Sequence, residues 1–104
     1  MRSADFRRVY DQGSRYSGPL FAAFYVRRPD GTGPKIGFTV PRAIGKATIR
    51  NRVKRRVREA IRLRLDQLNS QCEVVINPRR RLLDATFPEI EREVEKLFLR
   101  CAGS

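Results

Sequence analysis

The segment 42–64 carries ten positive charges and one acid, Glu59, yet it has the pattern of an amphipathic helix. At about 100° per residue, its apolar side chains share one arc of a helical wheel. That arc contains Ile49, Val53, Val57, Ala60, Ile61, Leu65 and Leu68. The opposite side contains Asn51, Arg52, Arg55, Arg58 and Arg62, with Lys54 at the border. We therefore expect a long helix, capped by Thr48 and ending near Leu68, whose apolar arc packs on a core.

The four arginines Arg52, Arg55, Arg58 and Arg62, called the arginine ridge below, indicate a phosphate-bearing partner. Like charges at i, i+4 repel one another unless something neutralises them, and the planar guanidinium binds phosphate oxygens with two hydrogen bonds. A merely solvated helix face would have acids interspersed. A leucine zipper is excluded because no heptads follow the helix, and a membrane-surface helix is disfavoured because the apolar arc must pack the fold. Arg50 and Arg64 fall inside the apolar arc, so we expect them to reach past the core.

The overall composition supports the same kind of partner. The chain has 23 Lys and Arg against 11 Asp and Glu, a net charge of +12, which favours a polyanion. It has no histidine, which excludes an imidazole base and a histidine metal ligand. We recognise no carboxylate pair placed for acid–base or two-metal chemistry, so we assign neither catalytic residues nor a metal site to the protein alone.

Other short features give more limited predictions. The glutamates at 89, 91, 93 and 95 lie about 200° apart in succession on a helix, and we interpret them as a solvated face. Cys72 and Cys101 are predicted to be buried free thiols of a reducing cytosol. The longest apolar run, 20–26, is too short to cross a bilayer, and the first residues lack a secretory signal. These features predict a cytoplasmic protein with neither a membrane nor a small molecule as its partner.

The remaining segments predict a single domain, residues 1–104, of the α+β class. Apolar periodicity indicates a helix over 4–12, capped by Ser3, and another over 86–101. Alternation indicates strands over 20–28, 35–40 and 72–77, with a short strand near 15–17. Gly37 and Thr39 lie on a small, polar side of their strand that could face a ligand. The order α-β-β-(β)-α-β-α implies a two-layer sandwich with one four-stranded sheet packed by helices.

Several runs together resemble the bacterial ribonuclease P protein component. The run 50–59, Arg-Asn-Arg-Val-Lys-Arg-Arg-Val-Arg-Glu, closely resembles the RNR signature helix of that family. The lead-in 37–47, the first helix around 5–10 with Gly13, and the strand 73–76 are similar to its other elements. Pro41 departs from the family, which often has a small polar residue there, and the family usually has a longer basic stretch before the first helix.

The resemblance implies a left-handed βαβ crossover around the RNR helix. It implies a large catalytic RNA as partner, which holds the Mg²⁺ and removes the 5′ leader of precursor tRNA, with the protein as a non-catalytic subunit of this endonuclease. By position, the contacts to the catalytic RNA would be Arg42, Lys46, Arg50, Asn51, Arg52 and Arg55. The single-stranded leader would be bound by Phe6, Tyr10 and Phe24, with Lys54 and Arg58 at the edge.

Two alternatives to this function stay open on the sequence. One is a structural RNA-binding protein of ribosomal type with no part in cleavage. The other is a stand-alone nuclease, which the missing histidine opposes. For the three aromatic residues, an ordinary place in the core is the alternative to a place in a leader site.

Overall fold

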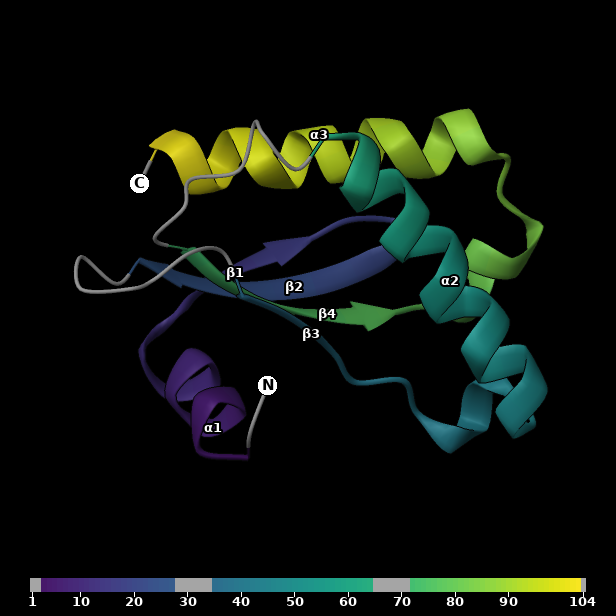
Figure 1. The fold of residues 1–104 in the computed structure, drawn as a ribbon, viewed down its shortest axis with the longest axis horizontal. Coiled ribbons are helices and arrows are strands. Elements are labelled where there is room, and N and C mark those ends of the chain that lie inside the picture. The colour runs from purple at the N-terminus through teal and green to yellow at the C-terminus, as the bar shows by residue number, and fades with distance from the viewer. Residues whose placement is uncertain (1–2, 28–34, 65–71, 104) are drawn as a thin grey trace.

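A computed structural model describes residues 3–27, 35–64 and 72–103 of the chain (Figure 1). The hairpin loop predicted at 29–34 and the predicted helix end at Leu65 and Leu68 lie outside these ranges. The α-helices are α1 (Ser3–Gln12), α2 (Ala47–Leu63) and α3 (Phe87–Gly103), and two 3₁₀ helices are η1 (Arg42–Ile44) and η3 (Arg80–Asp84). The strands are β1 (Ser14–Ser17), β2 (Phe21–Arg27), β3 (Lys35–Phe38) and β4 (Cys72–Pro78). The predicted order of elements is confirmed, including the short first strand.

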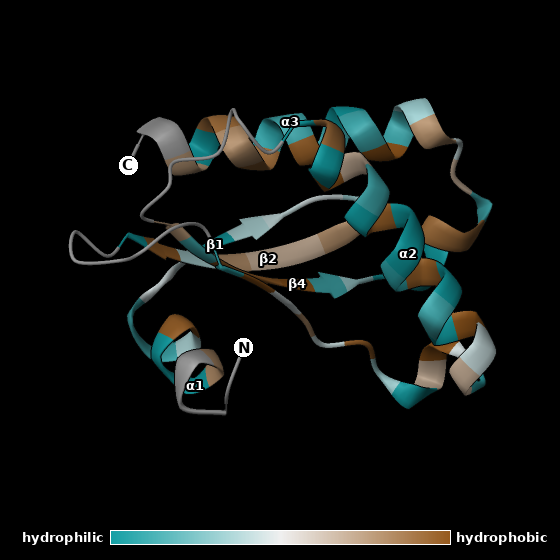
Figure 2. Cartoon of the chain, in the orientation of Figure 1, coloured by the Kyte–Doolittle hydropathy of each residue, from teal (hydrophilic) through white to brown (hydrophobic). Residues whose placement is uncertain are grey.

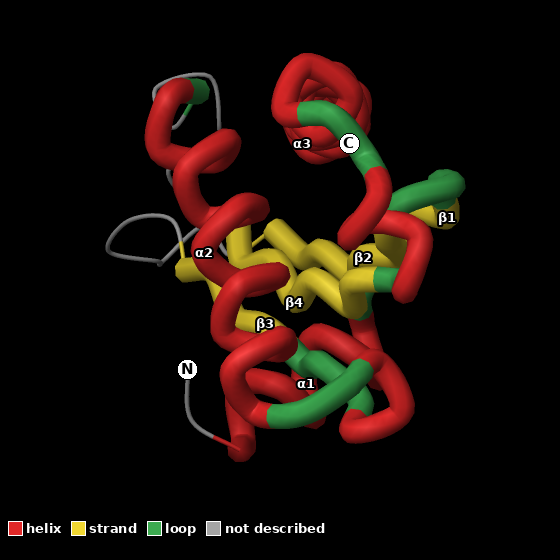
Figure 3. The backbone as a smooth tube through the Cα atoms, turned by 90° about the vertical axis from the view of Figure 1, so that its right-hand side faces the viewer, coloured by secondary structure: helices red, strands yellow, loops and turns green. Residues whose placement is uncertain are grey.

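The four strands form one mixed sheet in the order β1-β2-β4-β3. Strand β2 pairs antiparallel with β1 and with β4, whereas β3 pairs parallel with β4, with Ile36 opposite Val74. The connection from β3 to β4 runs through α2 above the sheet. Figures 1 and 3 show that this crossover is left-handed, against the strong right-handed preference of such connections. This confirms the α+β class and the crossover that the resemblance implied.

The core lies between one face of the sheet and the pair α2 and α3. Its fully buried side chains include Phe21 of β2, Ile76 of β4, Val57 of α2 and Leu97 of α3. Both sheet and helices follow the alternation and the 3–4 spacing of the sequence, and α2 is predominantly hydrophilic outside its buried stripe (Figure 2). Helix α1 lies on the other face of the sheet, against β2 and β4 (Figure 3), so helices flank both faces. The predicted two-layer arrangement is therefore incomplete, because α1 adds a helix to the second face.

Helix ends differ from the sequence expectation at one place and agree at another. Thr48 was expected to cap α2, but the cap residue is Lys46, which makes no side-chain hydrogen bond, and Thr48 lies in the first turn. The helix therefore begins two residues earlier than expected, and the chain enters it from Gly45, whose positive φ of 153° suits glycine. At α3, Thr86 and Glu89 form a capping box: Thr86 N–H donates to Glu89 Oε1 and Glu89 N–H donates to Thr86 Oγ1.

The interpretation of the glutamates of α3 as a solvated face is wrong. Glu93 is only 4% exposed, and its carboxylate accepts hydrogen bonds from the N–H groups of Leu20 and Phe21. Burial raises the pKa of Glu93, and these two N–H donors oppose the rise. The turn between β1 and β2 leaves these N–H groups facing α3, and a carboxylate satisfies them. A helical wheel alone cannot show that need.

Arg64 also departs from its expected path. It lies within the apolar arc of α2, as predicted, but its guanidinium turns to α3, where it lies 3.8 Å from Glu91 Oε2 and 3.5 Å from Glu95 Oε2. The two acids therefore pair across the helix interface. Cys72 and Cys101 are buried free thiols, as predicted.

Candidate nucleic-acid interface

The arginine ridge is formed by the outer side of α2. Asn51, Arg52, Arg55, Arg58 and Arg62 are all exposed there. On the opposite side, Val53 and Val57 are fully buried in the core. The separation of charge and apolar side chains predicted from the helical wheel is therefore confirmed, and the core holds the ridge in place.

The ridge is nearly without acids to neutralise it. Glu59 pairs with Arg62 at 2.6 Å, and both side chains are well exposed. Within the described part of the chain, no carboxylate forms an ion pair with Arg52, Arg55 or Arg58. An exposed pair such as Arg62–Glu59 contributes little stability, so the fold itself gains little from this charge. Unneutralised arginines on a rigid helix suit a polyphosphate backbone.

Arg56 belongs to the same run of cations, but its side chain has a structural role. Its guanidinium donates to the carbonyl oxygens of Leu82 at 3.0 Å and Ala85 at 2.6 Å. It therefore ties α2 to η3, and its charge is turned away from the ridge. This difference could not be predicted from the sequence, because Arg55 and Arg56 are neighbours of identical chemistry.

The other predicted contacts to RNA surround the start of α2. Arg42 of η1 and Lys46, the cap residue, are exposed at this end of the helix. Arg50 is half-buried, and its Nε atom is buried without a hydrogen-bond partner among the described residues. Five of the six predicted residues thus present exposed side chains, and Arg50 presents only part of its own.

The predicted aromatic residues lie on the α1 side of the sheet. The rings of Tyr10 and Phe24 meet edge to face with centroids 4.7 Å apart, and Phe6 lies one turn before Tyr10 on α1. Tyr10 is 38% exposed, and Phe6 and Phe24 are half-buried. None of the three belongs to the buried core cluster. They form an aromatic surface, a name used below for Phe6, Tyr10 and Phe24.

Polar groups from β4, from the residue after β3 and from β1 hold this surface. The Tyr10 hydroxyl donates to Asn77 Oδ1 at 2.9 Å and lies 3.3 Å from Thr39 Oγ1. The guanidinium of Arg15 lies over the Phe24 ring, 6.0 Å from its centroid, at cation–π distance. The small polar side of β3 that the sequence left open to a ligand therefore borders the aromatic surface at Thr39.

Lys54 and Arg58, predicted at the edge of the leader site, lie on α2 one turn apart. Arg58 stacks over the ring of Phe38 of β3 at 5.6 Å. This contact places Arg58 at the β3 edge of the sheet. In the described part of the chain, neither Lys54 nor Arg58 makes a hydrogen bond, ion pair or ring contact with the aromatic surface.

Two residues that anchor α1 were missed by the sequence analysis. Arg8 donates to both carboxylate oxygens of Glu73, at 2.9 and 3.0 Å, and Glu73 is 2% exposed. This pair fixes α1 against β4 and so positions Tyr10. An acid inside an apolar strand was the available signal, since a buried carboxylate needs a cation or several donors.

The described residues provide neither a metal-binding cluster nor a membrane-spanning helix. No three His, Cys, Asp or Glu side chains among them gather into a set that could hold a metal ion. No described helix is long and apolar enough to cross a membrane.

Comparisons with known proteins agree with this surface. The family model for Ribonuclease P matches residues 1–102. The chain is 38% identical over 95 residues to the ribonuclease P protein component of Symbiobacterium thermophilum, covering 91% of this chain and 83% of that protein. It is 38% identical over 96 residues to that of Mycolicibacterium gilvum, covering 89% and 77%.

Solved structures show the same likeness. The ribonuclease P protein of Thermotoga maritima superposes with a TM-score of 0.85 at 25% identity, covering 96% of this chain and 94% of that one. The Staphylococcus aureus protein superposes with a TM-score of 0.82, covering 98% and 92%, and at 24% identity this shows the fold alone.

Proposed function

The chain belongs to the family of bacterial ribonuclease P protein components, and we propose that it binds the catalytic RNA and the 5′ leader of precursor tRNA in that ribonucleoprotein. One observation carries the proposal most directly. Three arginines of the ridge, Arg52, Arg55 and Arg58, present exposed guanidinium groups without an acid as partner among the described residues, on a helix that packs on the core. Such a surface suits a phosphate backbone. The relatives of this chain are named as ribonuclease P protein components.

The catalytic RNA is assigned to the start of α2 and the ridge. Arg52 and Arg55 project outward, with Asn51 between Arg50 and Arg52, and Arg42 and Lys46 extend the surface past the helix end. Guanidinium groups on one rigid face can contact successive phosphates. Arg50 contributes through the part of its side chain that reaches the surface.

The leader is assigned to the aromatic surface. A single-stranded RNA needs aromatic faces for its bases and cations for its backbone, and stacking contributes about 1–3 kcal/mol per base. Tyr10 and Phe24 supply the faces, and Arg15 supplies a charge beside Phe24. Lys54 and Arg58, across β3, would contact the backbone where the leader passes toward the ridge.

The chemistry of cleavage is assigned to the RNA subunit, in the cytoplasm where tRNA is made. The chain has no histidine, and its described residues offer no cluster for a metal ion, which suits a non-catalytic subunit. We therefore propose that Mg²⁺ is bound mainly by the RNA. The protein binds and orients the substrate and adds positive charge beside it.

The test is reconstitution of cleavage. The full chain is added to a bacterial ribonuclease P RNA with precursor tRNA at a Mg²⁺ concentration too low for the RNA alone. We expect 5′-leader removal to be restored. Binding to the RNA without any stimulation would favour a structural RNA-binding protein, and cleavage without the RNA would show a stand-alone nuclease.

A further inference from the structure

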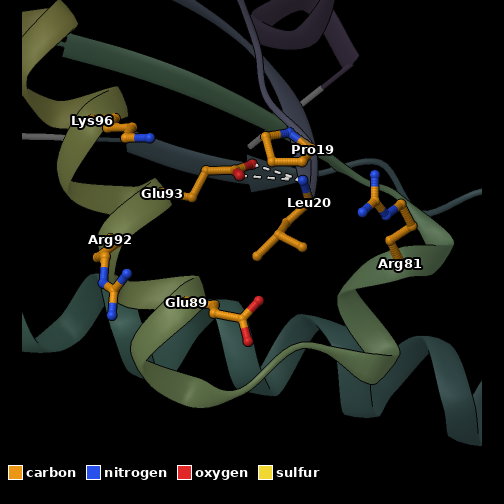
Figure 4. A pocket seen from close by; sticks show the side chains of 7 residues that line it. All are labelled: Pro19, Leu20, Arg81, Glu89, Arg92, Glu93 and Lys96. Atoms are coloured by element: carbon orange, nitrogen blue, oxygen red, sulfur yellow. Dashed lines mark hydrogen bonds between the residues drawn. The ribbon is translucent and has the colours of Figure 1, made fainter.

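A second group of cations lies outside the arginine ridge, on η3 and α3. Arg81 of η3 and Arg92 and Lys96 of α3 line a hollow of about 220 Å³ beside the turn between β1 and β2. Figure 4 shows the two α3 side chains on one side of this hollow and Arg81 on the other. The hollow is at the β1 edge of the sheet, whereas α2 covers the β3 edge (Figure 3).

The acids around the hollow are already engaged. The Glu93 carboxylate turns inward and accepts the N–H groups of Leu20 and Phe21, as Figure 4 shows for Leu20. Glu89 closes the capping box with Thr86. In contrast, Arg81, Arg92 and Lys96 make no hydrogen bond or close ion pair with any described residue. The three cations that line the hollow therefore form no hydrogen bond or close ion pair with the described residues, although the charge of Lys96 opposes the rise in the pKa of Glu93.

A fourth cation is fixed beside the hollow by neutral groups. Arg79 Nε donates to the carbonyl oxygen of Gly18 at 2.9 Å, and its Nη2 lies 3.1 Å from Ser17 Oγ. The side chain is exposed, and both of these hydrogen bonds go to neutral oxygens, although the charge also acts on Glu93 and opposes the rise in its pKa. Because its position is set before binding, it loses little conformational entropy when an anion arrives.

The shape and the charge favour phosphate over a membrane surface. An interfacial helix inserts its apolar side into the lipid, but the apolar side of α3, with Ile90, Val94 and Leu97, is fully buried on the sheet. Arginines from η3 and α3 line the hollow from two sides, and a guanidinium group matches the oxygens of a phosphate group. A hollow of about 220 Å³ is large enough for one such group.

We propose that Arg79, Arg81, Arg92 and Lys96 form a second RNA-binding surface, which holds backbone phosphates of an RNA segment other than the one on the arginine ridge. The inference rests on the proposed function only in taking RNA as the partner. With surfaces at the β3 and β1 edges of the sheet, one protein would touch two separate RNA segments at once.

The first test compares two charge-matched double variants of the full chain for binding to ribonuclease P RNA. Arg92→Gln with Lys96→Gln alters the second surface. Arg27→Gln with Lys35→Gln removes the same charges from exposed positions near the ends of β2 and β3. At roughly 0.15 M salt we expect affinity to fall about tenfold for the first pair only, with a salt slope flatter by about 1.5, since each phosphate contact adds about 0.7–0.9.

Equal losses of RNA affinity in both double variants would show that only net charge matters and would overturn the inference. No loss of affinity in either variant would overturn it as well. Binding of the native chain to phosphatidylserine vesicles, lost in the first pair while RNA binding is kept, would also overturn it. If the ridge variant Arg52→Ala with Arg55→Ala still weakens RNA binding while the first pair does not, the second surface fails and the proposed function stands.

A second test locates the RNA segment. The native cysteines are buried, so Lys96→Cys can be labelled selectively with a photo-cross-linker, and Arg52→Cys likewise. In the assembled ribonucleoprotein we expect the two probes to cross-link to different RNA nucleotides. If only Arg52→Cys formed cross-links, the proposal of a second RNA-binding surface would be overturned, and the assignment of RNA to the arginine ridge would stand.

Discussion

The hydroxyl of Tyr10 donates a 2.9 Å hydrogen bond to Oδ1 of Asn77, which lies 67 residues further along the chain. The bond joins α1 to β4, and the Arg8–Glu73 pair joins the same two elements. Tyr10 therefore keeps a fixed orientation although 38% of it is exposed. An exposed ring whose hydroxyl is fixed by a hydrogen bond is well arranged for stacking, because it loses little conformational entropy when a base binds.

This arrangement gives a prediction for Tyr10→Ala. We expect the variant to lose discrimination between precursor and mature tRNA by about 10-fold, because one stacked base contributes about 1–3 kcal/mol. Affinity for the catalytic RNA should stay the same. Equilibrium binding of both tRNAs to the reconstituted enzyme measures the ratio.

Tyr10→Phe is the matched control, since it keeps the ring and removes only the hydroxyl. We expect a smaller loss, corresponding to about 1 kcal/mol for the hydrogen bond to Asn77. If Tyr10→Ala binds precursor and mature tRNA with the native ratio, Tyr10 has a packing role only.

The arginine ridge gives a prediction for Arg52→Ala combined with Arg55→Ala. With about six phosphate contacts, the native chain should lose about 10³-fold in RNA affinity between roughly 50 and 200 mM salt. The double variant should bind more weakly and with a slope flatter by about 1.5. Filter binding across a salt series measures both, and an unchanged slope would show that RNA does not contact the ridge.

Buried Glu93 gives a prediction for stability against pH. Its pKa is raised by burial, so between the unfolded pKa and the raised folded pKa the native state binds more protons than the unfolded state. Its contribution to the free energy of unfolding therefore falls as pH rises through this window. Glu93→Gln removes the proton exchange and should remove this slope.

The measurement is urea unfolding of both proteins from pH 4 upward, at about half-unit steps through and beyond the ordinary glutamate range. We expect the native chain to lose stability relative to Glu93→Gln with increasing pH. A difference that is flat or grows with pH would show that the N–H donors of Leu20 and Phe21 outweigh burial.

The sequence predicted what depends on periodicity. The apolar arc of α2 required a core beneath it, so Val53 and Val57 and the exposed Arg52 and Arg55 were placed correctly. The strands followed from alternation, with Val74 and Ile76 inward. The left-handed crossover came only from the resemblance, because the general rule for parallel strands predicts the opposite hand.

What the sequence could not show depends on partners distant along the chain. Glu93 had the appearance of a solvated acid because the N–H groups that it accepts belong to a turn more than 70 residues away. Asn77 and Thr39 gave no signal of contact with Tyr10, since hydrogen-bond partners across a sheet have no fixed spacing. The capping box of Thr86 and Glu89, with its local spacing, was visible only as a helix start.

Arg55 and Arg56 are adjacent, and the structure separates their roles, which gives the last prediction. Arg56→Ala leaves the carbonyl oxygens of Leu82 and Ala85 without their donor and should lower the free energy of unfolding by about 1–3 kcal/mol. Arg55→Ala removes the same side chain from an exposed site and should change stability by less than about 0.5 kcal/mol. Urea unfolding measures both changes in stability. RNA binding, measured at a temperature where both variants are folded, should be weakened more by Arg55→Ala than by Arg56→Ala. If Arg56→Ala instead weakened RNA binding more than Arg55→Ala and kept the urea midpoint of the native chain, Arg56 would belong to the RNA interface and would not tie α2 to η3.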